Sequence, residues 1–135
     1  MREILFRGKR LDNGEWVKGF ITAACARARR LYFIEKPAQD LDDCNHSYEV
    51  EFTTVGQYTG MLDKNGNKIF EGDIVDFSDR SDGDGYGVVR YDENETEFEF
   101  EYDNIYRSLG SYYPKDIEVI GNIYDNPELL KEALK

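Results

Sequence analysis

Cysteine and histidine are scarce in this chain of 135 residues, and their scarcity limits its chemistry. The two cysteines, Cys25 and Cys44, cannot build a disulfide framework, and in a reducing cytosol we expect both to be free thiols. Together with His46, the single histidine, they could supply three zinc ligands. Structural zinc sites usually contain two closely spaced ligand pairs, and a second pair is missing here. We therefore predict no metal site and no cofactor.

Long apolar runs are also missing. No segment approaches the roughly 20 apolar residues that a membrane-spanning helix needs. The opening MREILFRGKR carries charges throughout, which is unlike a secretory signal peptide. We therefore expect a soluble, cytoplasmic protein that does not contact membranes.

Positive charge is in short supply: 17 Lys and Arg face 28 Asp and Glu, which gives a net charge of −11. This balance argues against direct nucleic-acid binding, because phosphates require a basic face. The charge is also uneven. Residues 1–36 carry nine Lys/Arg and four acids, whereas residues 71–103 carry thirteen acids and two Arg. Such opposite patches suit packing between subdomains or head-to-tail association of copies, although both could simply be solvated faces.

Catalytic motifs do not stand out either. The chain has no phosphate-binding Walker loop and no dinucleotide fingerprint. Cys44 and His46 would share one face of an extended segment, as catalytic Cys/His pairs can, but no flanking motif supports a nucleophile there. We therefore predict that the protein is not an enzyme and has no catalytic residues.

Two stretches resemble calcium-binding loops. In DKNGNKIFEGDIV (63–75), oxygen-bearing side chains alternate at Asp63, Asn65 and Asn67. The sixth position holds lysine in place of the required glycine, and the twelfth holds isoleucine in place of glutamate. Asn65-Gly66 instead predicts a hairpin with a type I′ turn, because both residues tolerate positive φ.

The second calcium-like stretch is DGDGYG (82–87), which is followed by a β-type segment in place of a helix. We expect an exposed acidic loop here. The alternative is weak binding of a divalent cation by Asp79, Asp82 and Asp84.

Short alternating segments separated by turn signals predict an all-β fold. In the first half we expect strands over residues 3–7, 15–21, 31–35 and 47–52, with Asn13-Gly14 as a hairpin turn. Residues 23–28 favour a helix by propensity, but that run is too short to be stable alone.

In the second half we expect strands over residues 54–60, 68–70, 74–77, 88–92, 95–103 and 117–125, the fourth and fifth joined by a turn near residues 92–94. A short helix should follow, with Asp125 or Asn126 as its N-cap and Pro127 at its first position. These strands fit a five-stranded SH3-like barrel. We predict an N-terminal β subdomain (1–54), an SH3-like β-barrel (55–124) and a C-terminal helix (125–135).

The segment ETEFEFEYD (95–103) alternates with period two. Its aromatic residues should face one side of the sheet, and four acids, Glu95, Glu97, Glu99 and Glu101, should face the other. Successive acids would lie ~6.6 Å apart, close to the spacing of about 6–7 Å between phosphates along a DNA strand. This acidic stripe is our candidate partner-binding site. The alternative is a solvated edge strand whose charges prevent aggregation.

Four separated segments resemble the YopX family of phage- and prophage-encoded proteins: REILFRGKRLDNGEWVKGF (2–20), VGQYTGMLDKNGNKIFEGDIV (55–75), YGVVRYD (86–92) and IEVIGNIYDNPELL (117–130). The resemblance implies an N-terminal β subdomain, a C-terminal SH3-like barrel and a bacterial host cell. It implies no reaction, because the family has no established biochemical function.

We therefore predict a non-catalytic phage accessory protein that binds proteins, either a host protein or its own copies as a homo-oligomer. The alternative is an acidic DNA mimic that inhibits a host nucleic-acid-binding protein. An enzyme is the third and weakest hypothesis, since the sequence offers no convincing acid, base or nucleophile set.

Overall fold

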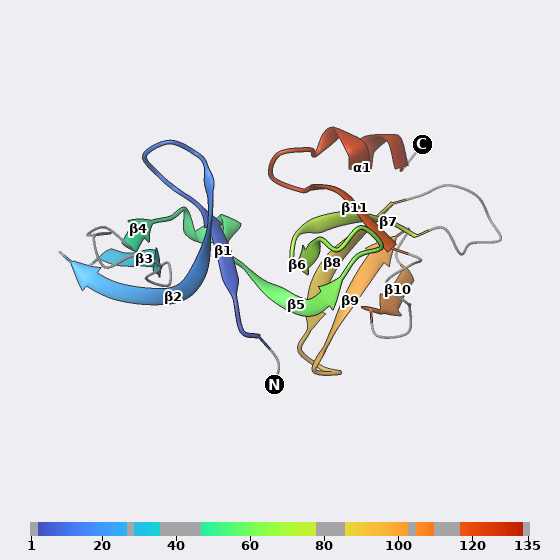
Figure 1. Cartoon of the computed structure of the whole chain (residues 1–135), viewed down its shortest axis with the longest axis horizontal. Helices are drawn as coiled ribbons and strands as arrows, with labels where there is room; N and C mark the ends of the chain where they lie inside the picture. The colour runs from blue at the N-terminus through green and yellow to red at the C-terminus, as the bar shows by residue number, and fades with distance from the viewer. Residues whose placement is uncertain are drawn as a thin grey trace. The chain divides into compact units, whose positions relative to one another are not determined.

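The structure is a computed structural model of the chain that describes residues 3–26, 29–35, 47–77, 86–102, 105–109 and 117–133. It divides into two compact units, residues 1–58 and 59–135. Antiparallel strands make up almost all of the regular structure in the described residues (Figure 1). The predicted all-β fold with one short C-terminal helix is confirmed.

The first unit is a sheet with strand order β4-β3-β2-β1-β5. Its strands are β1 (Phe6–Lys9), β2 (Trp16–Ala26), β3 (Arg29–Glu35), β4 (Ser47–Glu49) and the start of β5 (Gly56–Leu62), with a 3-10 turn η1 (Phe52–Thr54) before β5. The predicted turn at Asn13-Gly14 joins β1 to β2, and Gly14 takes a φ of +73°, which favours glycine.

The helical propensity of residues 23–28 does not prevail, because the described residues of this run, up to Ala26, continue strand β2. Ala23 pairs with Tyr32 and Ala26 pairs with Arg29 in the β2–β3 hairpin. The neighbouring strand supplies the backbone hydrogen bonds that so short a helix could not hold by itself.

A small core lies on one side of this sheet. Val17, Ile34 and Val50 are buried, and half-buried Phe6, Ile21, Tyr32, Tyr48 and Val55 pack around them. Because side chains alternate along a strand, the residues next to Val17 in sequence belong to the opposite face.

The second unit is a five-stranded antiparallel sheet with order β10-β9-β8-β7-β11. Its strands are β7 (Asp73–Phe77), β8 (Tyr86–Asp92), β9 (Glu97–Tyr102), β10 (Ile105–Ser108) and β11 (Ile117–Asn122). The continuation of β5 pairs with β6 (Lys68–Phe70). Helix α1 (Glu128–Ala133) follows Pro127 and contacts β8.

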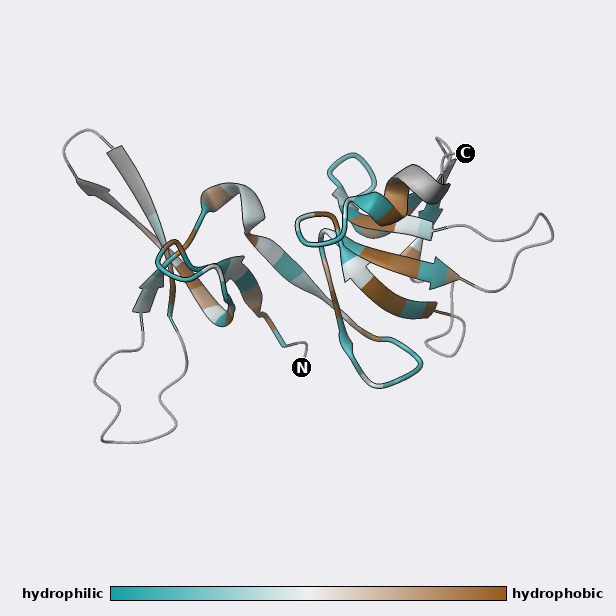
Figure 2. Cartoon of the chain, turned by 90° about the horizontal axis from the view of Figure 1, so that it is seen from above, coloured by the Kyte–Doolittle hydropathy of each residue, from teal (hydrophilic) through white to brown (hydrophobic). Residues whose placement is uncertain are grey.

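This unit holds the larger core. Phe77, Phe100 and Tyr102 pack with ring centroids 4.7 Å apart for Phe77–Phe100 and for Phe77–Tyr102. Buried aliphatic residues surround the rings: Ile69, Val75, Val89, Leu109 and Ile117. Figure 2 shows the hydrophobic segments gathered along the strands of this unit. Each fully buried side chain of this size contributes roughly 1.5–3 kcal/mol.

The calcium-like loop at residues 63–67 is a hairpin loop organised by a carboxylate. Asp63 is 3% exposed. It accepts backbone N–H bonds from Asn65 (2.9 Å) and Asn67 (2.8 Å), and a third from Val119 of strand β11 (3.0 Å). The predicted hairpin is confirmed, but the type I′ turn is wrong. Only Gly66, at +84°, has positive φ in this loop, because the carboxylate sets the loop's path.

Burial alone would raise the pKa of the Asp63 carboxyl. The backbone hydrogen bonds from Val119, Asn67 and Asn65 outweigh burial and hold that pKa below its ordinary value. The ionised form is therefore bound more tightly in the folded state. Its contribution to stability is present above about pH 4, the pKa of an unfolded aspartate, and is lost as the pH falls through the lower folded pKa.

We predict that Asp63→Ala lowers the free energy of unfolding by roughly 3 kcal/mol, because three backbone N–H groups lose a charged acceptor. The loss should shrink as the pH falls below about 4 and through the lowered folded pKa of Asp63, at which the wild-type carboxyl becomes protonated. Urea denaturation at neutral and acidic pH measures it. Asn65→Ala is the control, since it changes the same loop but keeps the carboxylate. Equal stability of the two variants would show that the Asp63 bonds contribute nothing.

Candidate interaction surfaces

The sheet of the second unit has a face opposite its core that is dominated by acids. Strand alternation and register place six carboxylates there, and we call this set the acidic face: Asp76, Asp92, Glu97, Glu99, Glu101 and Glu118. Strand β10 adds Tyr106, paired with Glu101, and Ser108, paired with Glu99. Tyr106 is 52% exposed.

Arg90 lies across the middle of the acidic face. Its Nη1 donates to Glu101 Oε2 at 2.8 Å, and its Nε lies 3.4 Å from Glu99 Oε1. The guanidinium also lies over the Tyr106 ring, 5.4 Å from its centroid. One cation thus joins strands β8, β9 and β10 through two carboxylates and an aromatic ring.

Glu99 is the buried member of the face, at 5% exposure. Burial raises the pKa of its carboxyl, and repulsion from Asp92 raises the pKa further, while attraction to Arg90 opposes both effects. Glu97, two residues away, is exposed and accepts a hydrogen bond from Ser108 Oγ at 3.2 Å.

The prediction of an acidic stripe is right about which side three of the acids face, but wrong about Glu95 and about the strand's position in the sheet. Phe98, Phe100 and Tyr102 do face the core, and Glu97, Glu99 and Glu101 do share the other face. Glu95, however, lies in the turn before β9. Strand β9 is flanked by β8 and β10, so it is not an edge strand. An even row of four exposed acids does not form, because the chain turns at residues 93–96 and the neighbouring strand supplies Arg90.

The first unit presents a different surface opposite its core. We call it the aromatic–basic face: Arg7, which is buried, with Lys9, Trp16, Lys18 and Phe20. The Arg7 guanidinium lies 4.7 Å from the centroid of the Trp16 ring, and Lys9 Nζ lies 5.5 Å from it. Such cation–π contacts are favourable and hold the ring in place.

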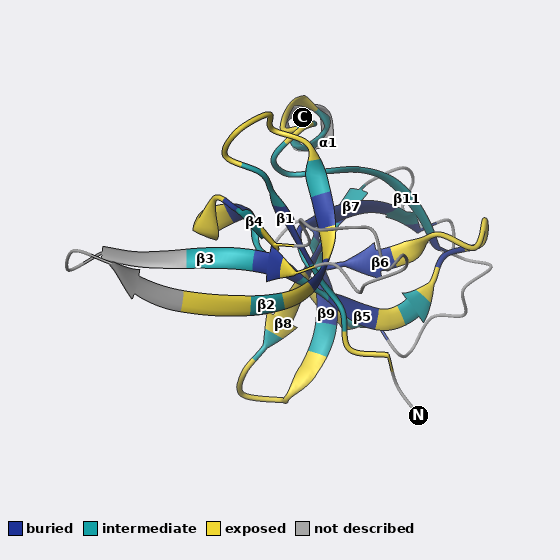
Figure 3. Ribbon diagram, turned by 60° about the vertical axis from the view of Figure 1, so that its left-hand side comes forward, coloured by how far each residue is buried: buried dark blue, intermediate teal, exposed yellow. Residues whose placement is uncertain are grey.

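Exposure rises on this side of strand β2: Trp16 is half-buried, Lys18 is exposed and Phe20 is 53% exposed. Figure 3 shows that β2 carries exposed segments. The sign of the charge then changes, because Phe20 pairs with Glu35. Glu49, paired with Phe33, lies on the same side of the sheet. The surface thus runs from cations, through an exposed phenyl ring, to carboxylates.

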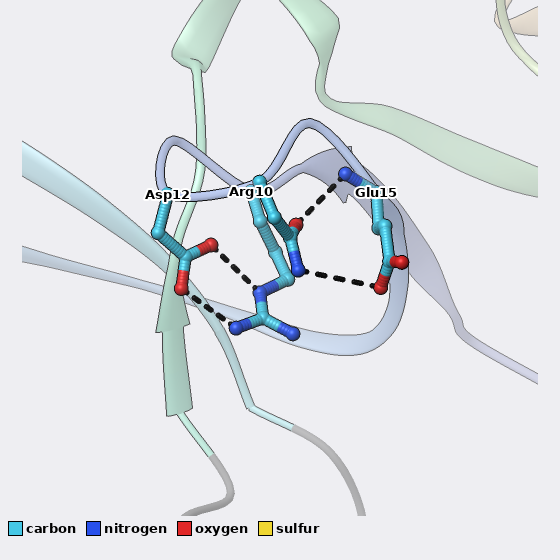
Figure 4. A network of polar contacts seen from close by, with 4 residues as sticks. Arg10, Asp12 and Glu15 are labelled. Atoms are coloured by element: carbon cyan, nitrogen blue, oxygen red, sulfur yellow. Dashed lines mark hydrogen bonds and ion pairs between the residues drawn. The ribbon is translucent and has the colours of Figure 1, made fainter.

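A third polar cluster lies in the β1–β2 turn. Arg10 Nε and Nη2 donate to the two Asp12 oxygens at 2.9 and 2.7 Å, and Asn13 and Glu15 bond each other (Figure 4). The Arg10 guanidinium also lies 4.2 Å from the Tyr48 ring centroid. The hydrogen bond from Arg10 lowers the pKa of the Asp12 carboxyl. All of these partners lie in the β1–β2 turn or, for Tyr48, on strand β4. We therefore infer that the cluster stabilises the turn and is not a binding site.

The structure describes only some of the residues that were considered as metal ligands or reactive thiols. Asp63 serves its own loop and β11, as described above. Cys25 lies on strand β2, whereas Cys44, His46 and the loop acids Asp79, Asp82 and Asp84 lie outside the described residues. Among the described residues, no three His, Cys, Asp or Glu side chains converge as metal ligands would. In that same part of the chain, no helix is long and apolar enough to cross a membrane.

Sequence reasoning singled out the acids of β9 but missed Arg90, Tyr106 and the aromatic–basic face. A signal existed for the last of these. The segment WVKGF (16–20) alternates tryptophan, lysine and phenylalanine on one side of a strand, opposite small and aliphatic residues. Placing Arg90 and Tyr106 beside the acids required the strand register, which the sequence does not contain.

We predict that Glu99→Gln raises the free energy of unfolding at pH 7. A folded-state pKa above the unfolded value means that ionised Glu99 costs stability. Wild-type stability should fall as the pH rises from about 4.3, the unfolded pKa of a glutamate, through the raised folded pKa. The gain should vanish well below pH 4, where both side chains are neutral. Urea denaturation from pH 3 to 8 checks this, with Glu97→Gln as the exposed control. A loss of stability at pH 7 would mean that the Arg90 pair outweighs burial.

Comparison with known proteins places the chain in context. The crystal structure of protein EF1440 from Enterococcus faecalis is similar, with a TM-score of 0.55 and 22% sequence identity, over 96% of this chain and 99% of that one. This likeness concerns the fold. No curated protein sequence gave a significant match. The family model described as YopX protein matches residues 5–131, nearly the whole length. The chain therefore belongs to the YopX protein family.

Proposed function

We propose that the protein is a non-catalytic, phage- or prophage-derived accessory protein of the bacterial cytoplasm that acts by binding other proteins. The observation that best supports this proposal is that each unit has an exposed aromatic side chain among charged side chains on a sheet face. Phe20 in the first unit and Tyr106 in the second are each more than half exposed, and each stands on a hydrogen-bonded strand. Aromatic residues and arginine are enriched in protein interfaces.

The backbone supports this proposal because it holds both faces rigidly. Phe20 lies on β2, which is paired with β1 on one side and β3 on the other. Arg90 and Glu101 lie on the adjacent central strands β8 and β9. Side chains on paired strands lose little further backbone freedom on binding, so their contacts are made at lower entropic cost. We also propose that the second unit is an SH3-like barrel, as its five short antiparallel strands suggest.

The second candidate is the acidic DNA mimic, and one observation favours it. The acidic face holds six carboxylates, with Arg90 and Lys64 as the ion-pair partners found there among the described residues. We prefer the first proposal because Arg90 pairs with two of the three β9 acids and one of these, Glu99, is buried, so the row of exposed negative charge that phosphate mimicry needs is interrupted.

We predict that wild-type protein, immobilised and exposed to host lysate, retains specific proteins that Glu97→Lys/Tyr106→Ser loses by at least about tenfold. Both changed side chains are exposed, so the variant should fold, which circular dichroism checks. Quantitative mass spectrometry measures the retained proteins. Glu93→Lys is the matched control, because it makes the same charge change in the β8–β9 turn, off the sheet face.

Competition by duplex DNA separates the two candidates. A mimic and DNA would occupy one site on the partner, so DNA should release the captured protein. A protein-binding face outside a DNA site predicts retention. If wild type retains nothing that the variant lacks, the acidic face is not a binding surface for a host protein.

A further inference from the structure

We infer that the aromatic–basic face of one copy docks on the acidic face of a second copy, head to tail. This inference deepens the proposed function and rests on it, because it names the partner as the chain itself. The two faces belong to different units, so each copy offers both halves of the contact.

Charge complementarity supports this choice of partner. The first surface presents the cations Lys9 and Lys18 at one end and Glu35 and Glu49 at the other, while Arg7 is buried against the Trp16 ring. A surface of only cations would suit any polyanion, including a nucleic acid. The carboxylates at the far end would repel phosphates, so the occupant should carry both signs.

The second surface carries both signs. Exposed Glu97 and half-exposed Glu101 present negative charge, while the Arg90 side chain, 49% exposed, presents positive charge beside them. Both surfaces also contain a large exposed ring, Phe20 on one and Tyr106 on the other. In the docked pair, the exposed acids of the second surface can form ion pairs with Lys18, and Arg90 can form ion pairs with the carboxylates at the far end of the first surface. The rings of Phe20 and Tyr106 would be buried between these charges.

Contact between an acidic face and an aromatic–basic face is favoured over contact between two acidic faces. Two acidic faces placed together would bring twelve carboxylates into one contact, and like charges facing each other cost free energy. Pairing unlike faces makes the contact heterologous. Such a contact leaves one unused face of each kind on every pair, so it extends to a closed ring or an open chain.

The test uses two variants, each with one face disabled. Lys18→Glu/Phe20→Ser changes the aromatic–basic face, and Glu97→Lys/Tyr106→Ser changes the acidic face. We expect wild type to self-associate at low salt and to dissociate as salt screens the exposed charges. Each variant alone should be monomeric, with its dissociation constant raised at least about tenfold. Light scattering after size exclusion measures the mass.

Mixing the two variants is the decisive step. Each retains the face that the other lacks, so an equimolar mixture should form a dimer and stop there. Glu93→Lys and Leu62→Ser are the controls, one for charge and one for lost exposed apolar surface, and both should assemble like wild type. Circular dichroism verifies each fold. Should a double variant unfold, Lys18→Glu or Glu97→Lys alone replaces it.

Three outcomes would overturn the inference: wild type that stays monomeric at low salt and high concentration, a variant that still self-associates, or a mixture without dimers. The proposed function fails separately. Host-protein capture that depends on the acidic face would leave protein binding intact even if self-association is absent. Loss of both capture and self-association would remove the proposed function itself.

Discussion

The second unit depends on a buried carboxylate used as a backbone acceptor. Asp63 collects N–H groups from its own loop and from Val119, which lies 56 residues later in the sequence. The loop between β5 and β6 is thereby tied to strand β11 at the margin of the five-stranded sheet. Asp73 acts similarly one turn later. It is 2% exposed and accepts the N–H of Phe70 at 2.8 Å. Burying a charge is costly unless hydrogen bonds satisfy it, and here the backbone supplies those bonds.

Strand register follows from these fixed turns, and the two faces of the sheet follow from register. Arg90 pairs with Glu99, so the cation and the buried acid share the face opposite the core. A shift of one residue would bring Phe100 to that face and the glutamates into the core, which the packing of Phe77 against Phe100 opposes. The aromatic core and the acidic face are therefore two results of one alternation.

Local patterns in the sequence were enough to predict most of the strands, the hairpins at residues 13–14 and 65–66, and the helix after Pro127, but strand β10 (Ile105–Ser108) was not predicted. These elements could be predicted because each is determined mainly by residues close together in the sequence. Three features depend on distant partners and could not be predicted. The bond from Val119 to Asp63 spans the unit, strand β9 is central only because β10 returns beside it, and residues up to Ala26 are extended because β3 pairs with them. Propensity favoured a helix there, and tertiary pairing overrode it.

The placement of charge between the units decides which contacts between copies are tolerable. Residues 1–58 carry nine Lys/Arg and nine Asp/Glu, whereas residues 59–135 carry eight and nineteen. All of the net charge of −11 therefore resides in the second unit. Any assembly that brought second units together would concentrate this charge and be opposed by repulsion. The contact proposed above, between the first unit of one copy and the second unit of another, would avoid that cost. It brings a unit with no net charge against an acidic one. The charge of the second unit thus selects against symmetric pairing through the acidic face.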